Sequence, residues 1–413
     1  MTTMAIDNKD KKVLKSSIER EQNEVACSAE CEKIKGSKNL NVPPLRFPEF
    51  TEEWKAEQLD NIATLSKGIG ISKEQLSEDG EPCILYGELY TKYKSEIIKQ
   101  VESKTDINGS KLKRSKANDV IIPCSGETAV DIATARCVPF DNILFGGDLN
   151  VISLHQYDGA FMSYQLNGKR KYDIARVAQG VSIVHLYGEH LKAIKTYNPT
   201  LPEQQKIAKL LSLLDDRIDT QNKIIEKLQS LIKGIAQHCI KESTSGNTYV
   251  KLGDICQITT GKLDANAQVD NGIYPFFTCA EQPFKIDSFA FDTEALLISG
   301  NGANLGYINY YKGKFNAYQR TYVLDLFSEN IQYIKWALKV LLPKRIAIEK
   351  SSSNTPYIVL STLTDLRLPI PCKSKQSFIA NLMQSLERKL SNQIAQYDSY
   401  NYLKQYLLRQ MFI

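Results

Sequence analysis

Most residues of this sequence that could do chemistry occur in short mixtures of basic, hydroxyl, amide and aromatic side chains, and two carboxylates lie near them. Such mixtures suit contacts with nucleic acid, because cations position phosphates while amide and guanidinium groups pair with base edges. In the first half of the chain the candidate residues are Lys67, Tyr86, Tyr90, Thr91, Lys92, Tyr93, Lys111, Lys113, Arg114, Ser125, Glu127, Thr128, Asp148 and Asn150. In the second half they are Thr260, Lys262, Asn301, Asn304, Tyr318, Gln319, Arg320, Ser352, Ser353 and Asn354.

Two of these stretches are the most informative. "KLKRSKAND" (111–119) is the densest basic segment and suits phosphate positioning, although a solvated loop explains the same composition. Gln319 and Arg320 are neighbours whose amide and guanidinium groups can pair in bidentate fashion with adenine and guanine edges. For the tyrosines between residues 86 and 93, packing in a hydrophobic core is the alternative.

The sequence lacks the motifs of enzymes that act on nucleic acid. Its nearest match to the Asn/Asp-Pro-Pro-aromatic motif of adenine methyltransferases is "NPTL" (198–201), which fails, and it has no G-x-x-x-x-G-K-[ST] loop. "GNGANLG" (300–306) resembles a dinucleotide loop, but "YINYY" follows it where a helix should begin. The four histidines have no metal-ligand spacing. We therefore expect no catalytic residue, no metal site and no cofactor in this chain.

The composition is that of a globular protein with a mild positive charge. The chain has 413 residues, of which 42% are hydrophobic and 24% charged. Its formal net charge of +5 is compatible with nucleic-acid binding without establishing it. The nine cysteines are scattered, which favours reduced thiols and a cytoplasmic location. No apolar run approaches the roughly 20 residues of a membrane span, so no membrane contact is expected.

Mixed segments alternate with long helical segments along the chain, which predicts an α+β fold. The expected divisions are a disordered leader (1–42), a first mixed domain (43–198), a helical region (199–242), a second mixed domain (243–372) and a C-terminal helical region (373–413).

The order of domain and helix repeats, and short stretches of sequence repeat with it. The matching pairs are "QLDNIATLSKG" (58–68) with "KLGDICQITTG" (251–261), "DVIIPCSGE" (119–127) with "EALLISGNG" (294–302), and "QKIAKLLSLLDDRI" (205–218) with "SFIANLMQSLERKL" (377–390). Because the matches extend over both domains and both helices, we predict an internal duplication.

Each long helix carries an apolar stripe with alternating steps of four and three residues, the spacing of a coiled-coil seam. Gln221 interrupts the first stripe near its middle, and Gln393 interrupts the second at the equivalent position. Because the two ends of a compact domain usually lie close together, the second helix should return antiparallel to the first. Gln221 would then face Gln393, and their hydrogen bond would set the register. The alternative is that each helix is independent and covers its own domain.

Two similar domains held apart by such helices suit a ligand that repeats at a fixed distance. Helices of about 38 residues span roughly 57 Å, and equivalent faces of duplex DNA recur about every 34 Å. Two domains held in this way would read two half-sites separated by an unread spacer. Because the domains have diverged in sequence, the half-sites should differ.

These features resemble the specificity subunit of type I restriction–modification enzymes. "LPEQQKIAKLLSLLDDRI" (201–218) is similar to the family's central repeat, and "VPPLRFPEF" (42–50) to the entry into its first target-recognition domain. Further segments similar to that domain are "YGELYTKY" (86–93), "IIPCSGET" (121–128), "GGDLNVISL" (146–154) and "AQGVSIVHLYGEHLKAI" (178–194). The chain departs from the family at "CKSKQSFIANLM" (372–383), which lacks the Leu-Pro-Glu-Gln-Gln opening of the first copy.

The resemblance implies two mixed α/β target-recognition domains joined by two long antiparallel coiled-coil helices, in an internal pseudo-two-fold repeat. It implies double-stranded DNA, two methyltransferase subunits and restriction subunits as partners, with S-adenosylmethionine, ATP and Mg²⁺ bound by those subunits. The chain itself would be a non-catalytic recognition subunit of a complex that cleaves DNA and methylates adenine. The alternatives are a coiled-coil adaptor with two protein-binding domains and a stand-alone DNA methyltransferase.

Overall fold

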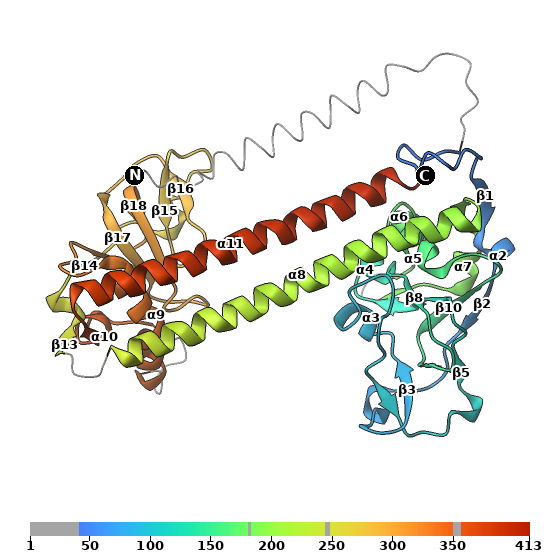
Figure 1. Ribbon diagram of the computed structural model, residues 1–413, viewed down its shortest axis with the longest axis horizontal. Helices are drawn as coiled ribbons and strands as arrows, with labels where there is room; N and C mark the ends of the chain where they lie inside the picture. Colours follow the sequence, from blue (N-terminus) through green and yellow to red (C-terminus); the bar gives the residue numbers. More distant parts are fainter. Residues whose placement is uncertain (1–40, 181–182, 244–247, 350–356) are drawn as a thin grey trace, which may run out of the picture. The chain divides into compact units, whose positions relative to one another are not determined.

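The computed structural model describes residues 41–180, 183–243, 248–349 and 357–413 (Figure 1). The predicted leader, residues 1–42, therefore lies almost entirely outside the described residues. The chain divides into two compact units, Met1–Asp215 with Leu403–Ile413 and Asp216–Tyr402. Each unit contains a part of both long helices.

An antiparallel sheet of four strands forms the centre of the first unit. In spatial order its strands are β2 (Ala63–Lys67), β10 (Leu149–Leu154), β6 (Asp119–Pro123) and β8 (Arg136–Val138). All five residues of β6 are buried, and its three central residues alternate between two apolar clusters. Val120 and Ile122 pack in one cluster and Ile121 in the other. The sheet is thus covered on both faces, as expected for a continuous apolar strand.

Smaller sheets and short helices surround this sheet. A second sheet of four strands has the spatial order β4 (Lys104–Thr105), β3 (Glu81–Ile84), β9 (Leu144–Phe145) and β5 (Lys113–Arg114). Two further sheets have two strands each. One pairs β1 (Lys55–Gln58) with β12 (Lys195–Asn198), and the other pairs β7 (Ser125–Gly126) with β11 (Val184–His185). The helices are α2 (Leu59–Ile62), η1 (Lys73–Gln75), α3 (Glu88–Thr91), η2 (Gly109–Lys111), α4 (Ala129–Ile132), α5 (Gly159–Asn167), α6 (Lys171–Val177) and α7 (Gly188–Lys192).

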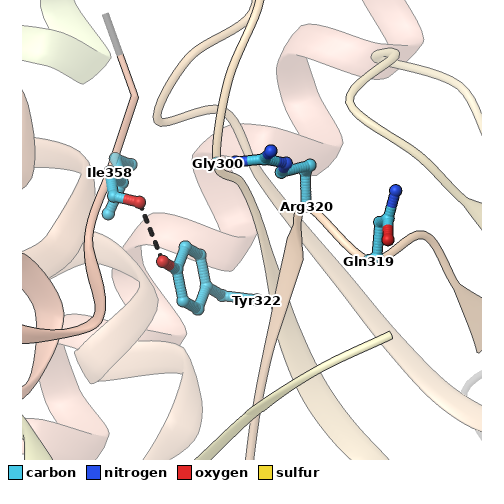
Figure 2. Close-up of a pocket in the computed structure, with 5 residues that line it drawn as sticks. All are labelled: Gly300, Gln319, Arg320, Tyr322 and Ile358. Carbon is cyan, nitrogen blue, oxygen red and sulfur yellow. Dashed lines mark hydrogen bonds between the residues drawn. The ribbon is translucent and has the colours of Figure 1, made fainter. Parts of the chain in front are cut away.

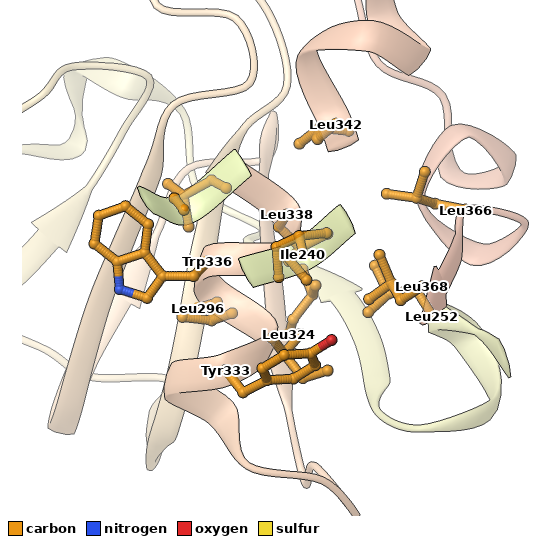
Figure 3. Packing of buried hydrophobic residues seen from close by; sticks show 14 of the residues in the cluster. Ile240, Leu252, Leu296, Leu324, Tyr333, Trp336, Leu338, Leu342, Leu366 and Leu368 are labelled. Atoms are coloured by element: carbon orange, nitrogen blue, oxygen red, sulfur yellow. The ribbon is translucent and has the colours of Figure 1, made fainter. Parts of the chain in front are cut away.

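A six-stranded sheet forms the second unit together with α9 (Ile331–Glu349). Its strands, in spatial order, are β14 (Gln257–Thr260), β19 (Thr321–Asp325), β17 (Phe291–Ser299), β18 (Ile308–Ala317), β15 (Tyr274–Phe277) and β16 (Phe284–Ile286). The smaller elements are β13 (Thr248–Lys251), η3 (Leu252–Asp254), η4 (Ala265–Ala267), α10 (Leu360–Thr364) and β20 (Arg367–Ile370). Helix α9 places Tyr333 and Trp336 in a core with Leu296 and Leu324 of the sheet (Figure 3).

In both units the part that contains the sheets begins and ends with the two strands of one pair. In the first unit β1 pairs with β12 just before the first long helix, and in the second β13 pairs with β20 just before the other. Each unit then needs a glycine where two backbones approach closely. A Cβ on Gly68 would lie 2.0 Å from the carbonyl oxygen of Gly146, and one on Gly261 would lie 1.9 Å from that of Ala317.

The two long helices are α8 (Leu201–Glu242) and α11 (Lys373–Gln410). Within the second unit they run antiparallel, because Arg217 lies against Tyr400 while Lys375 donates to the carbonyl of Glu242 at 3.0 Å. The residues of both predicted apolar stripes are buried or half-buried, as a seam requires. In the described part of the chain, the helices are too short or too polar to span a lipid bilayer.

The second long helix starts like the first although it lacks the Leu-Pro-Glu-Gln-Gln opening. Gln204 accepts a hydrogen bond from the backbone N–H of Asp158 at 2.9 Å, and Gln376 accepts one from that of Asn330 at 3.0 Å. Both glutamines also donate to the carbonyl of the proline five residues earlier, at 2.8 and 2.9 Å. The glutamine alone therefore preserves the contact between the long helix and the start of α5 or α9.

Candidate nucleic-acid interface

A pocket of about 890 Å³ in the first unit brings six of the predicted residues together. It lies where α3, the β7–β11 pair and the turn before β10 meet. The predicted residues that line it are Tyr86, Tyr90, Thr91, Ser125, Glu127 and Asp148. Its other lining residues include His185, Arg136, Asp131, Thr134 and Ile183.

The aromatic wall of this pocket is formed by Tyr86, just before α3, and by Tyr90, within α3. Tyr86 is 39% exposed, so its ring is available to a ligand. The hydroxyl of Tyr90 donates to the carbonyl of Ser125 at 3.1 Å, which ties α3 to β7. Burial, with smaller contributions from Asp131 and Tyr86, raises the pKa of Tyr90, so this hydroxyl stays protonated. Tyr90 thus holds the wall in place, and Tyr86 is the more accessible of the two rings.

Three carboxylates give the pocket an acidic lining. Asp148 accepts a hydrogen bond from the hydroxyl of Ser125 at 3.2 Å, and its backbone has a φ of 59°. Asp131 accepts one from the hydroxyl of Thr128 at 2.6 Å, while the Thr128 side chain caps α4. Glu127 is exposed beside them. Carboxylates repel phosphates but accept hydrogen bonds from base amino groups, so this pocket is suited to base edges.

A buried arginine lies beside these acids. Arg136 donates to the carbonyl oxygens of Tyr93 at 2.8 Å and Ala135 at 3.0 Å. Burial lowers the pKa of Arg136, and the charges of Glu96 and Asp215 partly oppose that effect. The hydrogen bonds of Arg136 therefore serve the fold, because they hold the segment after α3 against β8.

Several predicted residues of the first unit have structural contacts. Tyr93 is only 8% exposed and packs in the core, as the alternative for these tyrosines requires. Asn150 is 1% exposed and donates to the carbonyl of Leu186 at 3.0 Å. Lys67 is exposed, with its ammonium 5.8 Å from the centre of the Tyr187 ring. Of these three candidate residues, Lys67 is the one placed to reach a ligand.

The basic segment is partly committed to ion pairs within the unit. Arg114 binds both carboxylate oxygens of Glu81, at 2.6 and 3.0 Å. Lys92, a predicted residue outside that segment, pairs with Glu88 at 2.7 Å. Lys111 is exposed and Lys113 is half-buried. The structure therefore leaves the lysines of this segment, rather than Arg114, in position for phosphates.

In the second unit a smaller pocket of about 280 Å³ contains the predicted pair Gln319 and Arg320 (Figure 2). The two side chains extend in different directions from the segment that enters β19. The hydroxyl of Tyr322 donates to the carbonyl of Ile358 at 2.8 Å and closes one side. Burial raises the pKa of Tyr322, with Arg320 opposing the rise, so the hydroxyl is neutral. Gln319 and Arg320 are exposed and carry the donors of this site.

The other predicted residues that the structure describes in the second unit are not among those that line this pocket. Asn304 donates to the carbonyl of Cys279 at 3.0 Å, and Asn301 accepts from the thiol of the same residue at 3.0 Å, so both stabilise loops. Thr260 and Lys262 are exposed, and Tyr318 is half-buried. Three candidates, Ser352, Ser353 and Asn354, lie outside the described residues.

Sequence reasoning missed Tyr322 in the second pocket and several residues of the first, namely Asp131, Thr134, Arg136, Ile183 and His185. Ile183 and His185 lie within "AQGVSIVHLYGEHLKAI" (178–194), so the resemblance of that segment was a signal for them, whereas only their position in the fold marks the others. In the described ranges no group of three or more His, Cys, Asp or Glu side chains could hold a metal ion.

The comparison with protein families decides what kind of protein carries these two sites. A model of the type I restriction modification DNA specificity domain matches residues 51–230 and, a second time, residues 244–397. The chain belongs to this family. The double match also confirms the predicted duplication and the resemblance to type I specificity subunits.

Relatives and solved structures in this family agree. The chain is 44% identical over 137 residues to the EcoDI specificity subunit of Escherichia coli, covering 33% of this chain and 30% of the relative. It is 25% identical over 256 residues to the MjaIX specificity subunit of Methanocaldococcus jannaschii, covering 52% of this chain and 59% of the relative. Both matches thus span less than two thirds of the relatives' lengths. The fold is similar to that of the S subunit from M. genitalium, with a TM-score of 0.64 and 19% identity over 90% of this chain and 99% of the other.

Proposed function

We propose that this chain is the DNA-recognition subunit of a type I restriction–modification enzyme, in which each domain reads one half of a bipartite, asymmetric target. One observation carries this proposal: two domains of the specificity family in one chain have different side chains at their candidate sites. The first presents the carboxylates of Glu127 and Asp148, and the second presents Gln319 and Arg320. Acceptors and donors select different base edges, so the two half-sites differ.

In this proposal the chain supplies recognition and its partners supply catalysis. Two methyltransferase subunits and the restriction subunits would bind S-adenosylmethionine, ATP and Mg²⁺ in the cytoplasm. Exposed apolar side chains on α8, such as Ile224 and Leu231, are the kind of surface on which such subunits dock.

The test is to assemble the chain with the methyltransferase subunits of its own system and to map methylated adenines on genomic DNA. We expect one asymmetric motif in two parts, and binding to a duplex of that motif that weakens as salt rises. Modification without sequence preference would contradict the proposal. Binding of S-adenosylmethionine to the isolated chain, measured by calorimetry, would favour a stand-alone methyltransferase instead.

A further inference from the structure

The two pockets occupy the same place in the repeated fold, and hydrogen bonds show it. In the first unit the N–H of Cys124 donates to the carbonyl of Asp148 at 2.7 Å. In the second the N–H of Gly300 donates to the carbonyl of Arg320 at 2.8 Å. In each case the residue after a central strand bonds the residue before the neighbouring strand. Asp148 and Arg320 are therefore equivalent positions.

The next contacts extend this equivalence to the segment before α7 and α10. The carbonyl of Cys124 accepts from the N–H of Leu186 at 2.8 Å, and that of Gly300 accepts from the N–H of Ile358 at 2.8 Å. A side chain two residues after Asp148 or Arg320 then donates to that same segment. As described above, these donors are Asn150, to the carbonyl of Leu186, and Tyr322, to the carbonyl of Ile358.

The register of the strands shows independently that Asn150 and Tyr322 occupy equivalent positions. Asn150 lies opposite Lys67 on one side and Ile122 on the other. Tyr322 lies opposite Thr260 and Ile298 in the same way. The predicted residues Lys67 and Thr260, each one residue before a required glycine, are thus equivalent as well.

Asp148 and Arg320 are held rigidly at the backbone while their side chains reach the surface. Both side chains are exposed and line their pockets. Ser125 orients the carboxylate of Asp148. In the described part of the chain no hydrogen bond or ion pair occupies the guanidinium of Arg320. The backbone hydrogen bonds place each side chain at a defined point of the fold, and an exposed polar tip is available to hydrogen-bond a base edge.

We propose that Asp148 and Arg320 are the equivalent specificity determinants of the two domains. Asp148 accepts a hydrogen bond from a base amino group in one half-site, that is, from cytosine N4 or adenine N6. Arg320 donates two hydrogen bonds to O6 and N7 of a guanine in the other half-site. This inference rests on the proposed function, since it assigns the reading of single bases to residues of the same sites.

The experiment uses the complex with its methyltransferase subunits and compares methylated-adenine maps of Arg320→Lys, Arg320→Gln and Asp148→Asn with wild type. Arg320→Lys keeps the charge but loses the planar fork, so it separates base reading from attraction to phosphate. We expect both Arg320 variants to lose discrimination for one guanine by about 10- to 100-fold, and Asp148→Asn to change one base preference in the other half-site. The matched controls are Lys285→Gln and Asp106→Asn, exposed residues outside both pockets, whose maps should equal wild type.

The melting temperature of each variant complex is measured as well, because a variant whose melting temperature equals that of wild type has folded. Loss of a base preference in the expected half-site by a folded variant supports the assignment. An unchanged motif that is merely modified more slowly, or a change in both half-sites from one substitution, overturns it. If wild type itself modifies no bipartite motif, the proposed function fails. If wild type does so and folded variants keep every base preference, only this inference fails.

Discussion

The side-chain amide of Gln221 donates one hydrogen bond to the side-chain oxygen of Gln393 at 2.9 Å and another to the Gln393 carbonyl at 3.0 Å. Gln221 is only 2% exposed, so water can hardly replace these bonds. A polar pair inside an apolar seam reduces stability and disfavours other alignments of the helices. The role of this pair in setting register remains our prediction, and stability measurements can test it.

Replacing Gln393 by leucine should destabilise the second unit by about 1–3 kcal/mol, because the buried amide of Gln221 loses its side-chain acceptor. The double variant Gln221→Leu/Gln393→Leu should regain that stability, since two apolar groups replace both partners. Urea unfolding of wild type, both single variants and the double variant measures this coupling. Gln229→Leu, at an exposed position of α8, the helix of Gln221, is the control and should change stability by less than about 0.5 kcal/mol. Independent, additive effects of the two substitutions would contradict the pairing.

The periodic part of the fold could be predicted from the sequence, because a seam, its two glutamines and a gapless match of two helices are local and regular. The sites could be predicted only in part. Tyr86 and Tyr90 line the pocket, whereas Tyr93 is in the core. The orientation of a single-turn helix depends on contacts with distant residues, here Tyr90 with Ser125.

The equivalence of Asp148 and Arg320 could not be predicted from the sequence either. Matching "DVIIPCSGE" with "EALLISGNG" residue by residue puts Cys124 beside Ser299, but the hydrogen bonds put it in the place of Gly300. Backbone pairing across the sheet sets the register between strands. Because β6 and the end of β17 are buried on both faces, their apolar sequences also match after a shift of one residue.

Lys404→Met should destabilise the first unit by about 3–5 kcal/mol. The ammonium of Lys404 lies 2.6 Å from a carboxylate oxygen of Glu96 and 2.6 Å from one of Asp215, and its side chain is 16% exposed. Its removal leaves two buried carboxylates without their cation. Chemical unfolding measures the loss, with the exposed Lys389→Met on the same helix as control. Equal stability of the two variants would show that these ion pairs do not hold the end of α11.

The contribution of Lys404 should also depend on pH. Burial alone lowers its pKa, but Glu96 and Asp215 outweigh burial and raise it above the ordinary value. The folded state therefore binds this proton more tightly than the unfolded chain does. The stabilisation is fully present below the unfolded pKa of about 10.4 and is lost as pH rises through the higher folded pKa. The difference in unfolding free energy between wild type and Lys404→Met should therefore shrink above about pH 10.4. A difference that stays constant with pH would argue against a charge effect.

Gly68→Ala and Gly261→Ala should each destabilise its own unit by more than about 2 kcal/mol. In both positions the new Cβ would meet a backbone carbonyl oxygen at 2.0 Å or less, so the two backbone segments must move apart. Gly234→Ala is the matched control, since nothing lies within 4 Å of a Cβ there and the residue is helical. That control should gain about 0.5–1 kcal/mol. If Gly68→Ala and Gly261→Ala are as stable as wild type, the close approach of two backbones is not the reason that both units have a glycine here.

The most direct test of the central claim is an exchange of the predicted first domain, residues 43–198, for the corresponding domain of a relative with a different target. The methylated adenines of the hybrid complex would then be mapped on genomic DNA. We predict that one half-site takes the relative's sequence, while the other half-site and the spacer length stay as in wild type. A map in which both half-sites change, or neither does, would contradict the claim that each domain reads its own half of the target.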